Sequence, residues 1–542
     1  MRLDQYLGFS TAPDYGPPPP DDVSSRVWDV CIIGSGAAGS SFAHEIVSAG
    51  HSVVMLEQGP FVDQNLSYAD VVKQAEAAYV RLYSGCWGLI GFPWTSCNVG
   101  GGTVYYGAAS FRYREVDFDV SEYFPHAELP VAWPYDYTEL APYYEHIETL
   151  LGIAADPSRD PTAPPWGSAS YLPPIEPSRA GQLLTDGGRS LGLRPFPTPL
   201  AIATVPYRGR EACDKESPCI EHQCQRRAKA DAVTVLLQPM LLGGGLDLFA
   251  GLRVVRLERD TPSTVARAVA VHVATQQRYE IRARYFVVAC SAIESAALLL
   301  RSADEHAPTG LGNENDMVGR GLCFKASEWV LGWYEGSQRS EPRPNHGPFS
   351  TVAFTDYYLD SAAPGGMGGL IYEASVGSRH HLSGDEASVR IECILGDTPS
   401  RENRVQLAPD RDALGVPRTV MDYTPHPRDQ ARLEHMIGRC EELLRASGCR
   451  NVRRSGKDYR LGGTHLHGTC RGGHDAKTSV VDPWSRVHTL DNLYVVDTSF
   501  FPSSGAVNPS LTAMANALRV GDHLIQKMGS AKKMEKGSTV AV

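Results

Sequence analysis

The stretch VWDVCIIGSGAAG, residues 27–39, decides the fold that this chain is expected to adopt. Its first seven residues are mostly apolar and β-branched, as in a buried strand of a parallel sheet. Glycines then follow in the spacing G-x-G-x-x-G, and a helical pattern, SSFAHEIVSAG, continues to Gly50. Strand, glycine loop and helix in this order predict a dinucleotide-binding unit.

The three glycines of this loop have different physical roles. Gly34 is expected to make the tight turn after the strand. Gly36 lets the backbone approach a pyrophosphate, and Gly39 allows the helix to pack closely on the strand. The spacing therefore predicts all three as cofactor-binding residues.

The parts on either side of the glycines complete the expected unit. Ala37 and Ala38 open the helix, whose N–H groups and dipole would meet the phosphates. A second apolar run, 52–56, ends at Glu57, which is expected to accept hydrogen bonds from the adenosine ribose. NAD and FAD both fit this pattern, so other segments must decide between them.

Three later segments favour FAD. NVGGGT, residues 98–103, is a second glycine-rich loop, suited to lie against a flavin ring and its phosphates. YFVVA, residues 285–289, and NLYVVD, residues 492–497, are each predicted as a strand that leads toward a helix. The cofactor residues expected from these segments and their surroundings are Asn98, Gly101, Gly102, Thr103, Tyr106, Val254 and Asp497.

Length, composition and charge limit the function further. A chain of 542 residues suggests about two or three domains. With 42% hydrophobic and 21% charged residues it has the composition of a globular protein. A net charge of −11 argues against a nucleic-acid partner and is compatible with a cationic substrate.

The ends of the chain and its hydropathy give no sign of a membrane protein. No apolar stretch approaches the ~20 residues that span a bilayer. Residues 1–26 are expected to form a loose arm without a signal peptide, and residues 531–542 a frayed tail. We therefore expect a cytoplasmic protein in which most of the twelve cysteines are reduced.

Several motifs in a fixed order resemble the glucose–methanol–choline family of flavin-dependent alcohol oxidoreductases, over nearly the whole chain. They are GSGAAG with Glu57, NVGGGTVYYG, WPYDYTELAPYYE, HLHGTCRGG, SVVDPWSRVH, NLYVVDTSFFP and VNPSLT. The resemblance implies an α/β fold with a Rossmann-like FAD-binding domain and an α+β substrate domain built on an antiparallel sheet. The FAD-binding domain would take residues 27–155, 206–310 and 456–530, the substrate domain 311–455, and a connecting segment 156–205.

The resemblance also implies the catalytic residues. The family places its catalytic histidine in the pattern H-x-x-G-T, which here begins at His465. Its partner corresponds to Asn508, and Asn508 and Pro509 would also border the flavin. Histidine suits the role of base for a hydroxyl proton while hydride passes to the flavin. His467 is assigned to the substrate side of the site, as a packed residue and not as the base.

Two other features of these motifs concern a metal site and the attachment of FAD. Histidines at 465 and 467 lie on one side of a strand, as a metal pair would, but Cys470, His474 and Asp475 nearby lack a zinc-type spacing. No metal is therefore expected. In relatives the loop TVYYGAA can carry a histidine bonded covalently to FAD; here it has none, so non-covalent FAD is expected, with Tyr105 or Tyr106 facing the flavin.

The cysteines at 213, 219 and 224 form the only cluster in the sequence. A similar segment in some dehydrogenases of the family binds a three-iron cluster that passes electrons outward. The last spacing here is one residue longer, and thiols that merely pack are favoured. Both alternatives remain open, as does the choice between oxygen and another electron acceptor.

The substrate is predicted from two directions. The chain resembles most the family members of aminoglycoside pathways that oxidise a primary hydroxyl of an amino sugar to the aldehyde, which an aminotransferase then converts. Independently, Glu328, Glu373 and Glu392 lie among apolar neighbours in the expected substrate strands, where carboxylates are uncommon. They are predicted to bind the cationic amino sugar, unless neighbours such as Lys325 and Arg390 neutralise them.

Two rival functions remain. A dehydrogenase of neutral sugars or polyols would pass electrons through the cysteine cluster to an external acceptor. A catalytically inactive flavoprotein scaffold is disfavoured, because it would not need His465 together with Asn508.

Overall fold

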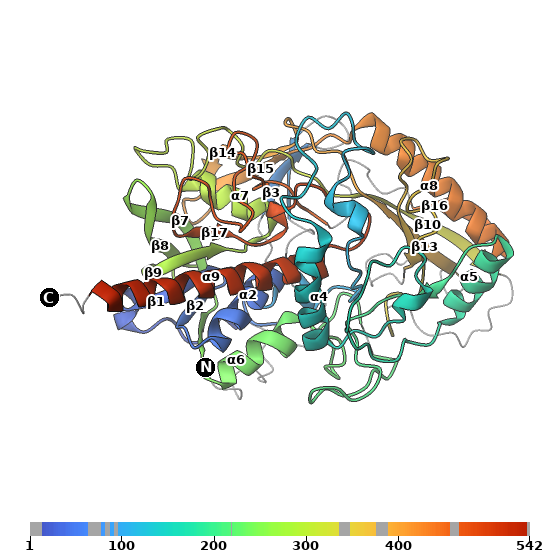
Figure 1. Ribbon diagram of the computed structural model, residues 1–542, viewed down its shortest axis with the longest axis horizontal. Helices are drawn as coiled ribbons and strands as arrows, with labels where there is room; N and C mark the ends of the chain where they lie inside the picture. The colour runs from blue at the N-terminus through green and yellow to red at the C-terminus, as the bar shows by residue number, and fades with distance from the viewer. Residues whose placement is uncertain are drawn as a thin grey trace.

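The computed structural model describes residues 14–62, 77–81, 87–91, 96–217, 219–334, 347–374, 388–455 and 465–538. Two large sheets lie side by side, one near each end of the molecule, as Figure 1 shows. The first thirteen residues of the expected arm, and the expected boundary at 456, lie outside the described residues.

The first sheet carries the expected dinucleotide-binding unit. Its strand order is β6-β2-β1-β9-β8-β7, with β17 paired to β9. The pairs of β1 with β2 and β9, of β2 with β6, and of β9 with β17 are parallel, whereas β7, β8 and β9 form an antiparallel meander. The strands are β1 (Val27–Ile33), β2 (Val53–Leu56), β6 (Leu246–Phe249), β7 (Leu252–Thr261), β8 (Thr264–His272), β9 (Arg278–Val288) and β17 (Leu493–Val495).

Helices from both ends of the chain cover this sheet. In Figure 1 the long α9 runs beside α2, and α4 crosses them. Alternate residues of β1, such as Val30 and Ile32, pack against Phe42 of α2 and Leu524 of α9. The helices are α2 (Ala37–Ser48), α4 (Tyr137–Leu151), α6 (Gln238–Leu242), α7 (Ser291–Arg301) and α9 (Ser510–Ser538). The helix α9 continues past residue 530, where a frayed tail was expected.

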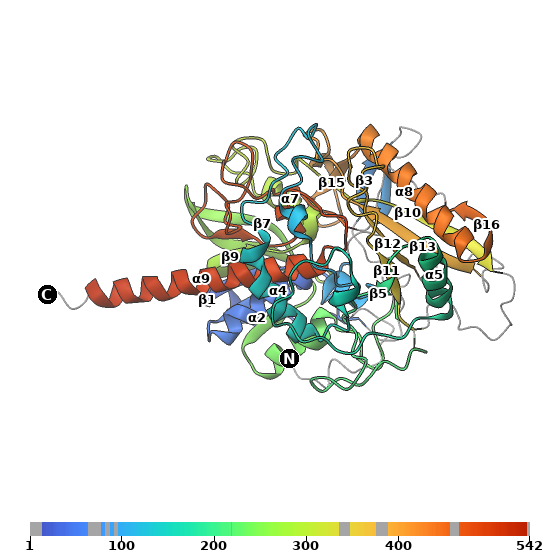
Figure 2. The same cartoon turned by 45° about the vertical axis from the view of Figure 1, so that its right-hand side comes forward.

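The second sheet is antiparallel throughout, in the order β16-β10-β13-β12-β11-β5. Helices α5 and α8 pack on its outer face, as Figure 2 shows. Its elements are β5 (Phe196–Pro197), β10 (Ala326–Tyr334), β11 (Val352–Phe354), β12 (Leu370–Glu373), β13 (Ser388–Leu395), β16 (Cys449–Arg454), α5 (Arg179–Ser190) and α8 (Pro427–Ala446).

A smaller sheet and short helical turns connect these parts. The sheet has the order β14-β15-β3-β4, with β3 (Ala77–Arg81), β4 (Trp87–Gly91), β14 (Arg404–Arg411) and β15 (Pro417–Asp422). The short helices are η1 (Asp21–Ser25), η3 (Gly101–Val104), η4 (Glu115–Phe118), η5 (Pro157–Arg159), η6 (Val233–Leu237) and η10 (Thr498–Phe500). Within the described residues, no helix has the length and apolar character that crossing a bilayer demands.

Candidate functional site

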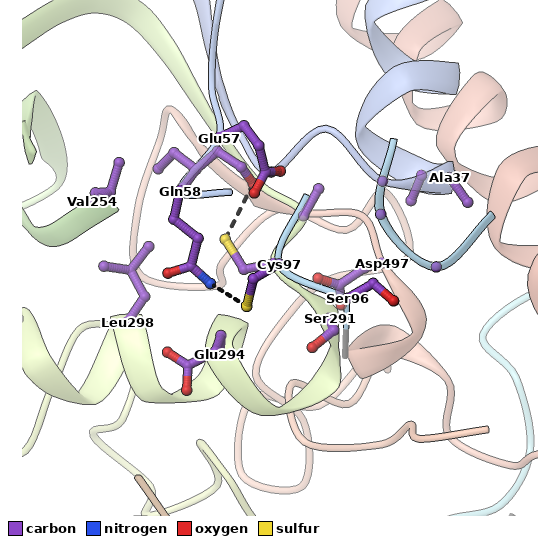
Figure 3. Close-up of a pocket in the computed structure, with 18 of the residues that line it drawn as sticks. Ala37, Glu57, Gln58, Ser96, Cys97, Val254, Ser291, Glu294, Leu298 and Asp497 are labelled. Atoms are coloured by element: carbon purple, nitrogen blue, oxygen red, sulfur yellow. Dashed lines mark hydrogen bonds between the residues drawn. The ribbon is translucent and has the colours of Figure 1, made fainter. Parts of the chain in front are cut away.

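A cavity opens at the carboxyl ends of the parallel strands, where the glycine loops meet (Figure 3). This is the edge at which open α/β sheets bind their ligands. Of the predicted cofactor residues, the cavity is lined by Gly34, Gly36, Ala37, Ala38, Glu57, Gly101, Gly102, Val254 and Asp497. They come from positions up to 463 residues apart in the chain and meet around one space.

The first glycine loop is shaped by close backbone contacts. Gly34 has a φ of 100°, and a Cβ there would lie 2.3 Å from the Ala289 carbonyl oxygen. A Cβ on Gly39 would lie 2.2 Å from the Gly34 carbonyl oxygen. These two glycines therefore hold strand and helix together, as the pattern predicts.

Gly36 has a different environment. The nearest atom to a Cβ on Gly36 would be the Gly101 Cα, at 4.0 Å, and a Cβ on Gly102 would meet nothing within 4 Å. Protein packing does not require glycine at either position. Both border the cavity, so the space that they leave fits a ligand lying against the backbone, as a dinucleotide does.

Glu57 lies at the end of β2, inside the cavity wall. Its carboxylate accepts hydrogen bonds from the backbone N–H groups of Ser35 (3.0 Å) and Gly59 (2.9 Å) and from the Ser35 hydroxyl (2.7 Å). Burial raises the pKa of Glu57, and these bonds oppose the rise. The Gly100 N–H donates to the Ser35 hydroxyl at 3.0 Å, which ties the second glycine loop to the first.

Three residues predicted to contact the cofactor support this second loop without lining the cavity. The Asn98 amide donates to the Val99 carbonyl at 2.8 Å. The Thr103 hydroxyl donates to the Gly100 carbonyl at 2.7 Å. The Tyr106 hydroxyl donates to the Ala230 carbonyl at 2.5 Å, and its position beside the flavin stays a prediction. The sequence could not distinguish the residues that shape a loop from those that the loop presents.

Other residues of the cavity carried no signal in the sequence. Figure 3 shows Gln58, Ser96, Cys97 and Glu294 around the same space. The Gln58 amide donates to the Cys97 sulfur at 3.1 Å. On α7, Glu294 pairs with Arg301 at 2.6 Å, and both line the cavity. Gln58, Ser96 and Cys97 adjoin the motifs in sequence, whereas only the fold brings Glu294 and Arg301 to the glycine loops.

His465 and Asn508 meet as the motif implies. The distance between His465 Nε2 and Asn508 Nδ2 is 3.2 Å, and both residues are half-buried. Ser510, two residues after Asn508, begins α9 and lines the cavity. The pair therefore lies beside the cavity. Pro509 lies between Asn508 and Ser510 and is not itself part of the cavity wall.

His467 lies behind this pair. It is 1% exposed, its Nδ1 is 3.0 Å from the His465 carbonyl oxygen, and its Nε2 is 3.7 Å from an Asp397 carboxylate oxygen. Burial lowers the pKa of His467 to about 3, so its ring is neutral at ordinary pH. As a neutral donor it can fix the backbone of His465. Its burial corrects the assignment of His467 to substrate binding.

A buried lysine supports the other member of the pair. Lys325 Nζ donates to the carbonyl of Val507, the residue before Asn508, and to the Tyr113 hydroxyl at 3.2 Å. Burial lowers the pKa of Lys325 to about 7, while Asp117 and Asp397 oppose that change. Lys325 thus fixes the backbone at Asn508, a role that the sequence did not reveal.

Of the three predicted substrate carboxylates, Glu328 and Glu373 lie on one face of the second sheet and Glu392 lies on the other. Glu328 shares a face with Val330, and Glu373 with Ile371; both neighbours pack in the apolar layer beneath α8. Glu328 accepts from the Ser455 hydroxyl at 2.6 Å, and Glu373 from the Ser178 hydroxyl at 2.5 Å. The prediction that Glu328 and Glu373 bind substrate is corrected.

Glu392 lies on the face that turns toward the catalytic pair. It pairs across the sheet with Tyr372, whose hydroxyl donates to the Glu392 carboxylate at 2.9 Å. The Tyr372 ring packs in the core that also holds Val507, and the Asn508 amide donates to the Tyr372 hydroxyl oxygen. Of the three carboxylates, Glu392 therefore connects to the catalytic pair. Tyr372 provides this connection and carried no signal in the sequence.

The cysteines at 213, 219 and 224 are brought close enough to influence one another electrostatically. Cys219 and Cys224 are buried in the apolar core, and burial raises the pKa of Cys219 to about 11. Among the described residues, the three sulfurs do not form a set within 4.8 Å. Both alternatives for this cluster remain predictions.

Known proteins resemble this chain over most of its length. Models of the family described as GMC oxidoreductase match residues 92–326 and 399–517. The chain is 47% identical to 6'''-hydroxyparomomycin C oxidase of Streptomyces lividus, over 92% of this chain and 91% of that protein. It is 45% identical to paromamine 6'-oxidase of Streptomyces fradiae, over 91% and 90%. Formate oxidase of Aspergillus oryzae, in a variant studied for FAD modification, superimposes with a TM-score of 0.68 at 14% identity, over 94% and 99%.

Proposed function

This chain belongs to the GMC oxidoreductase family, whose members use a flavin, and we propose that it oxidises a primary hydroxyl of an aminoglycoside or its precursor to the aldehyde. The family and the two-part α/β fold expected from the sequence are confirmed. Two relatives that align along nine-tenths of the chain, named 6'''-hydroxyparomomycin C oxidase and paromamine 6'-oxidase, support the substrate class.

The chain supplies the groups for the proton half of the reaction. Bound FAD would accept the hydride from the alcohol carbon. His465 is the base that takes the hydroxyl proton. Asn508 donates from its amide to the substrate oxygen and cannot compete for that proton. The 3.2 Å approach of the two side chains allows both to reach one oxygen atom.

The position of the buried Glu392 carboxylate is the observation that best supports a cationic substrate. The Tyr372 hydroxyl connects this carboxylate to the Asn508 side chain. A protonated amine of the substrate would pair with Glu392 at low local dielectric, where a charge pair is stronger than in water. In this proposal, Glu392 binds the charged amine of the substrate beside the catalytic pair, on the inner face of the second sheet.

Anaerobic reduction of the flavin tests this assignment. A glucosamine-containing pseudodisaccharide should reduce the flavin far better than glucose, and rising salt should weaken its apparent affinity. Glu392→Gln should raise KM for the cationic substrate about tenfold, equivalent to ~1.4 kcal/mol.

Glu328→Gln and Glu373→Gln are matched controls for that variant. They make the same chemical change on the opposite face of the same sheet and should leave KM near the wild-type value. Equal reduction by glucose, insensitive to salt, would leave only a flavin-dependent sugar oxidoreductase. A larger KM effect in Glu328→Gln or Glu373→Gln would reject the role of Glu392.

We further propose that FAD is held without a covalent bond. In the described part of the second glycine loop, residues 96–106, no histidine is present to attach it. Acid precipitation should release the yellow flavin into the supernatant, whereas colour retained in the pellet would contradict this proposal. We also propose that an aminotransferase acts on the aldehyde product.

A further inference from the structure

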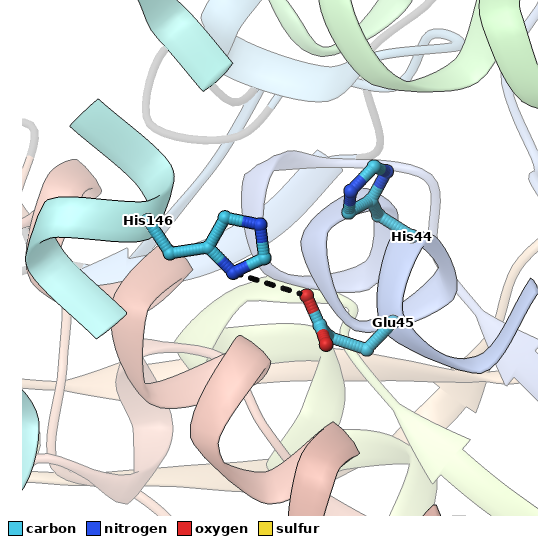
Figure 4. Close-up of side chains that lie close together, drawn as sticks. All are labelled: His44, Glu45 and His146. Atoms are coloured by element: carbon cyan, nitrogen blue, oxygen red, sulfur yellow. Dashed lines mark ion pairs between the residues drawn. The ribbon is translucent and has the colours of Figure 1, made fainter. Parts of the chain in front are cut away.

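His44, Glu45 and His146 form a compact cluster away from the catalytic pair, and we propose that they bind a divalent cation of the zinc type. Figure 4 shows the three side chains facing one another, two from α2 and one from α4. One ligand atom from each residue lies within 4.8 Å of the other two. Nothing in the family chemistry described above uses these residues.

The distances suit a metal ion. His146 Nδ1 and Glu45 Oε1 are 3.4 Å apart. Ligand atoms of a tetrahedral zinc site with bonds of about 2.0–2.1 Å lie about 3.3–3.4 Å from each other. The rings of His44 and His146 lie edge to face, with centroids 5.9 Å apart at 63°, and a nitrogen of each ring lies within 4.8 Å of the other and of a Glu45 carboxylate oxygen. A small rotation of His44 would complete three ligands.

Glu45 gives independent support. Its Oε1 is shielded from solvent and, apart from the 3.4 Å approach of His146 Nδ1, no described residue offers it a hydrogen bond. A buried carboxylate oxygen without a donor is unfavourable, and a bound cation would satisfy it. His146 is 43% exposed at its side chain, so an ion can enter from solvent and keep a water molecule as its fourth ligand.

The second group of this kind is a poorer candidate. Cys323, Asp397 and His467 also approach within 4.8 Å, but all three are buried. Asp397 already accepts from the Phe324 N–H at 2.8 Å and from the Tyr423 hydroxyl at 3.1 Å. The Asp397 oxygens are therefore already hydrogen-bonded in the core. Because none of the three residues is exposed, an ion could not reach them directly from solvent.

The surroundings of the proposed site define what the ion would do. Asp522 of α9, which accepts from the Tyr143 hydroxyl at 2.9 Å, lies close enough to influence Glu45 electrostatically. Arg208 is the nearby positive charge and would weaken a cation's binding. A bound ion would join α2 to α4, and α2 begins at the cavity. It would thus stabilise the loaded enzyme without taking part in turnover.

The test uses the FAD-loaded enzyme, first freed of metal with a chelator and then titrated with Zn²⁺. Bound zinc per chain and melting temperature are measured together. The wild type should bind an ion at this site and melt at a higher temperature with zinc, since a ligand of the folded state stabilises it. His146→Gln and His44→Gln should each lose one bound ion and this rise, or bind it at least about tenfold more weakly. Turnover should stay at the wild-type value.

Two controls separate this site from other zinc binding. His306 lies 3.4 Å from the Glu305 carboxylate, like His146 from Glu45, but belongs to no three-residue group among the described residues. His306→Gln and Cys213→Ser should therefore keep the ion and the rise in melting temperature. Absence of zinc from the wild type, or undiminished binding in both His44→Gln and His146→Gln, would overturn the proposal.

Discussion

At the scale of single residues, His465 and Asn508 lie 43 positions apart in the chain and 3.2 Å apart in space. His465→Ala removes the base, so we expect the rate of flavin reduction to fall by ~10²–10⁴-fold while FAD stays bound. Asn508→Ala should also slow reduction. Stopped-flow absorbance under anaerobic conditions measures both rates.

His467→Ala is the comparison that assigns the roles. Because His467 is buried behind His465, its loss should disturb the pair less than loss of His465 itself. A larger decrease in His467→Ala than in His465→Ala would reverse the assignment of the base.

His467 should also contribute to the pH dependence of the free energy of unfolding. Burial lowers its pKa from 6.5 to about 3, so between these values the unfolded chain binds a proton that the folded chain does not. The free energy of unfolding should therefore fall as pH drops below 6.5, by ~1.4 kcal/mol per pH unit from this group. Above pH 6.5 this effect is absent.

Urea unfolding at pH 7.5 and 5.5 measures that contribution. His467→Gln does not titrate, so its stability should fall less on acidification than the wild type's. His126→Gln replaces an exposed histidine, so its free energy of unfolding should fall between pH 7.5 and 5.5 by as much as that of the wild type. An identical pH dependence in His467→Gln and wild type would show that His467 is protonated in the folded chain.

The role of a residue could be predicted where a sequence motif contains it. It could not be predicted where the role depends on which face of a sheet the side chain occupies. The pattern H-x-x-G-T pointed to His465, and the structure places it beside Asn508. Glu328 and Glu392 look alike in sequence, since both are carboxylates among apolar neighbours. Only the position of α8 decides that Glu328 lies on the covered face and Glu392 on the inner one.

At the scale of elements, the two glycine loops separate packing from ligand contact. Gly36 has a φ of −68°, which alanine accepts, and a Cβ there would meet no protein atom closer than 4.0 Å. Gly36→Ala should leave the stability of the apoprotein within about 0.5 kcal/mol of wild type. Its FAD affinity should weaken by about tenfold or more, because the methyl group enters the cofactor's space.

Gly39→Ala and Gly438→Ala are the two controls for this prediction. A Cβ at Gly39 collides with backbone, so that apoprotein should lose ~1–3 kcal/mol or more. A Cβ at Gly438, within α8, meets nothing within 4 Å and lies far from the cavity, so FAD affinity should not change. Melting of the apoprotein and fluorescence titration with FAD make the comparison. Unchanged affinity in Gly36→Ala would remove Gly36 from the binding surface.

The elements themselves differ in how far sequence predicts them. The unit β1-α2-β2 follows from a local pattern of apolar residues and glycines, because each step concerns neighbours in the chain. The support of the second loop by Tyr106 and Ala230 joins residues 124 positions apart, so no local pattern reports it.

At the scale of the whole molecule, the first sheet is assembled from separate stretches of the chain. Its strands come from residues 27–56, 246–288 and 493–495, while the second sheet is composed mainly of residues between 326 and 454. Resemblance to a family implied this division. Composition and periodicity alone would have given α/β segments without the order of the strands, because pairing depends on contacts distant in sequence.

The cavity wall runs from Ile33 to Ala513, and this has a consequence for biosynthesis. At translation rates of about 5–20 residues per second, roughly 25–100 s separate the emergence of β1 from that of α9. Throughout this interval the apolar face of β1 that carries Val30 and Ile32 lacks the cover of α9, whereas its neighbours β2, α2 and β9 are made earlier. Coenzyme can load only after Asp497, Ser510 and Ala513 have emerged, and cells that make the chain faster than they supply FAD should accumulate apoprotein.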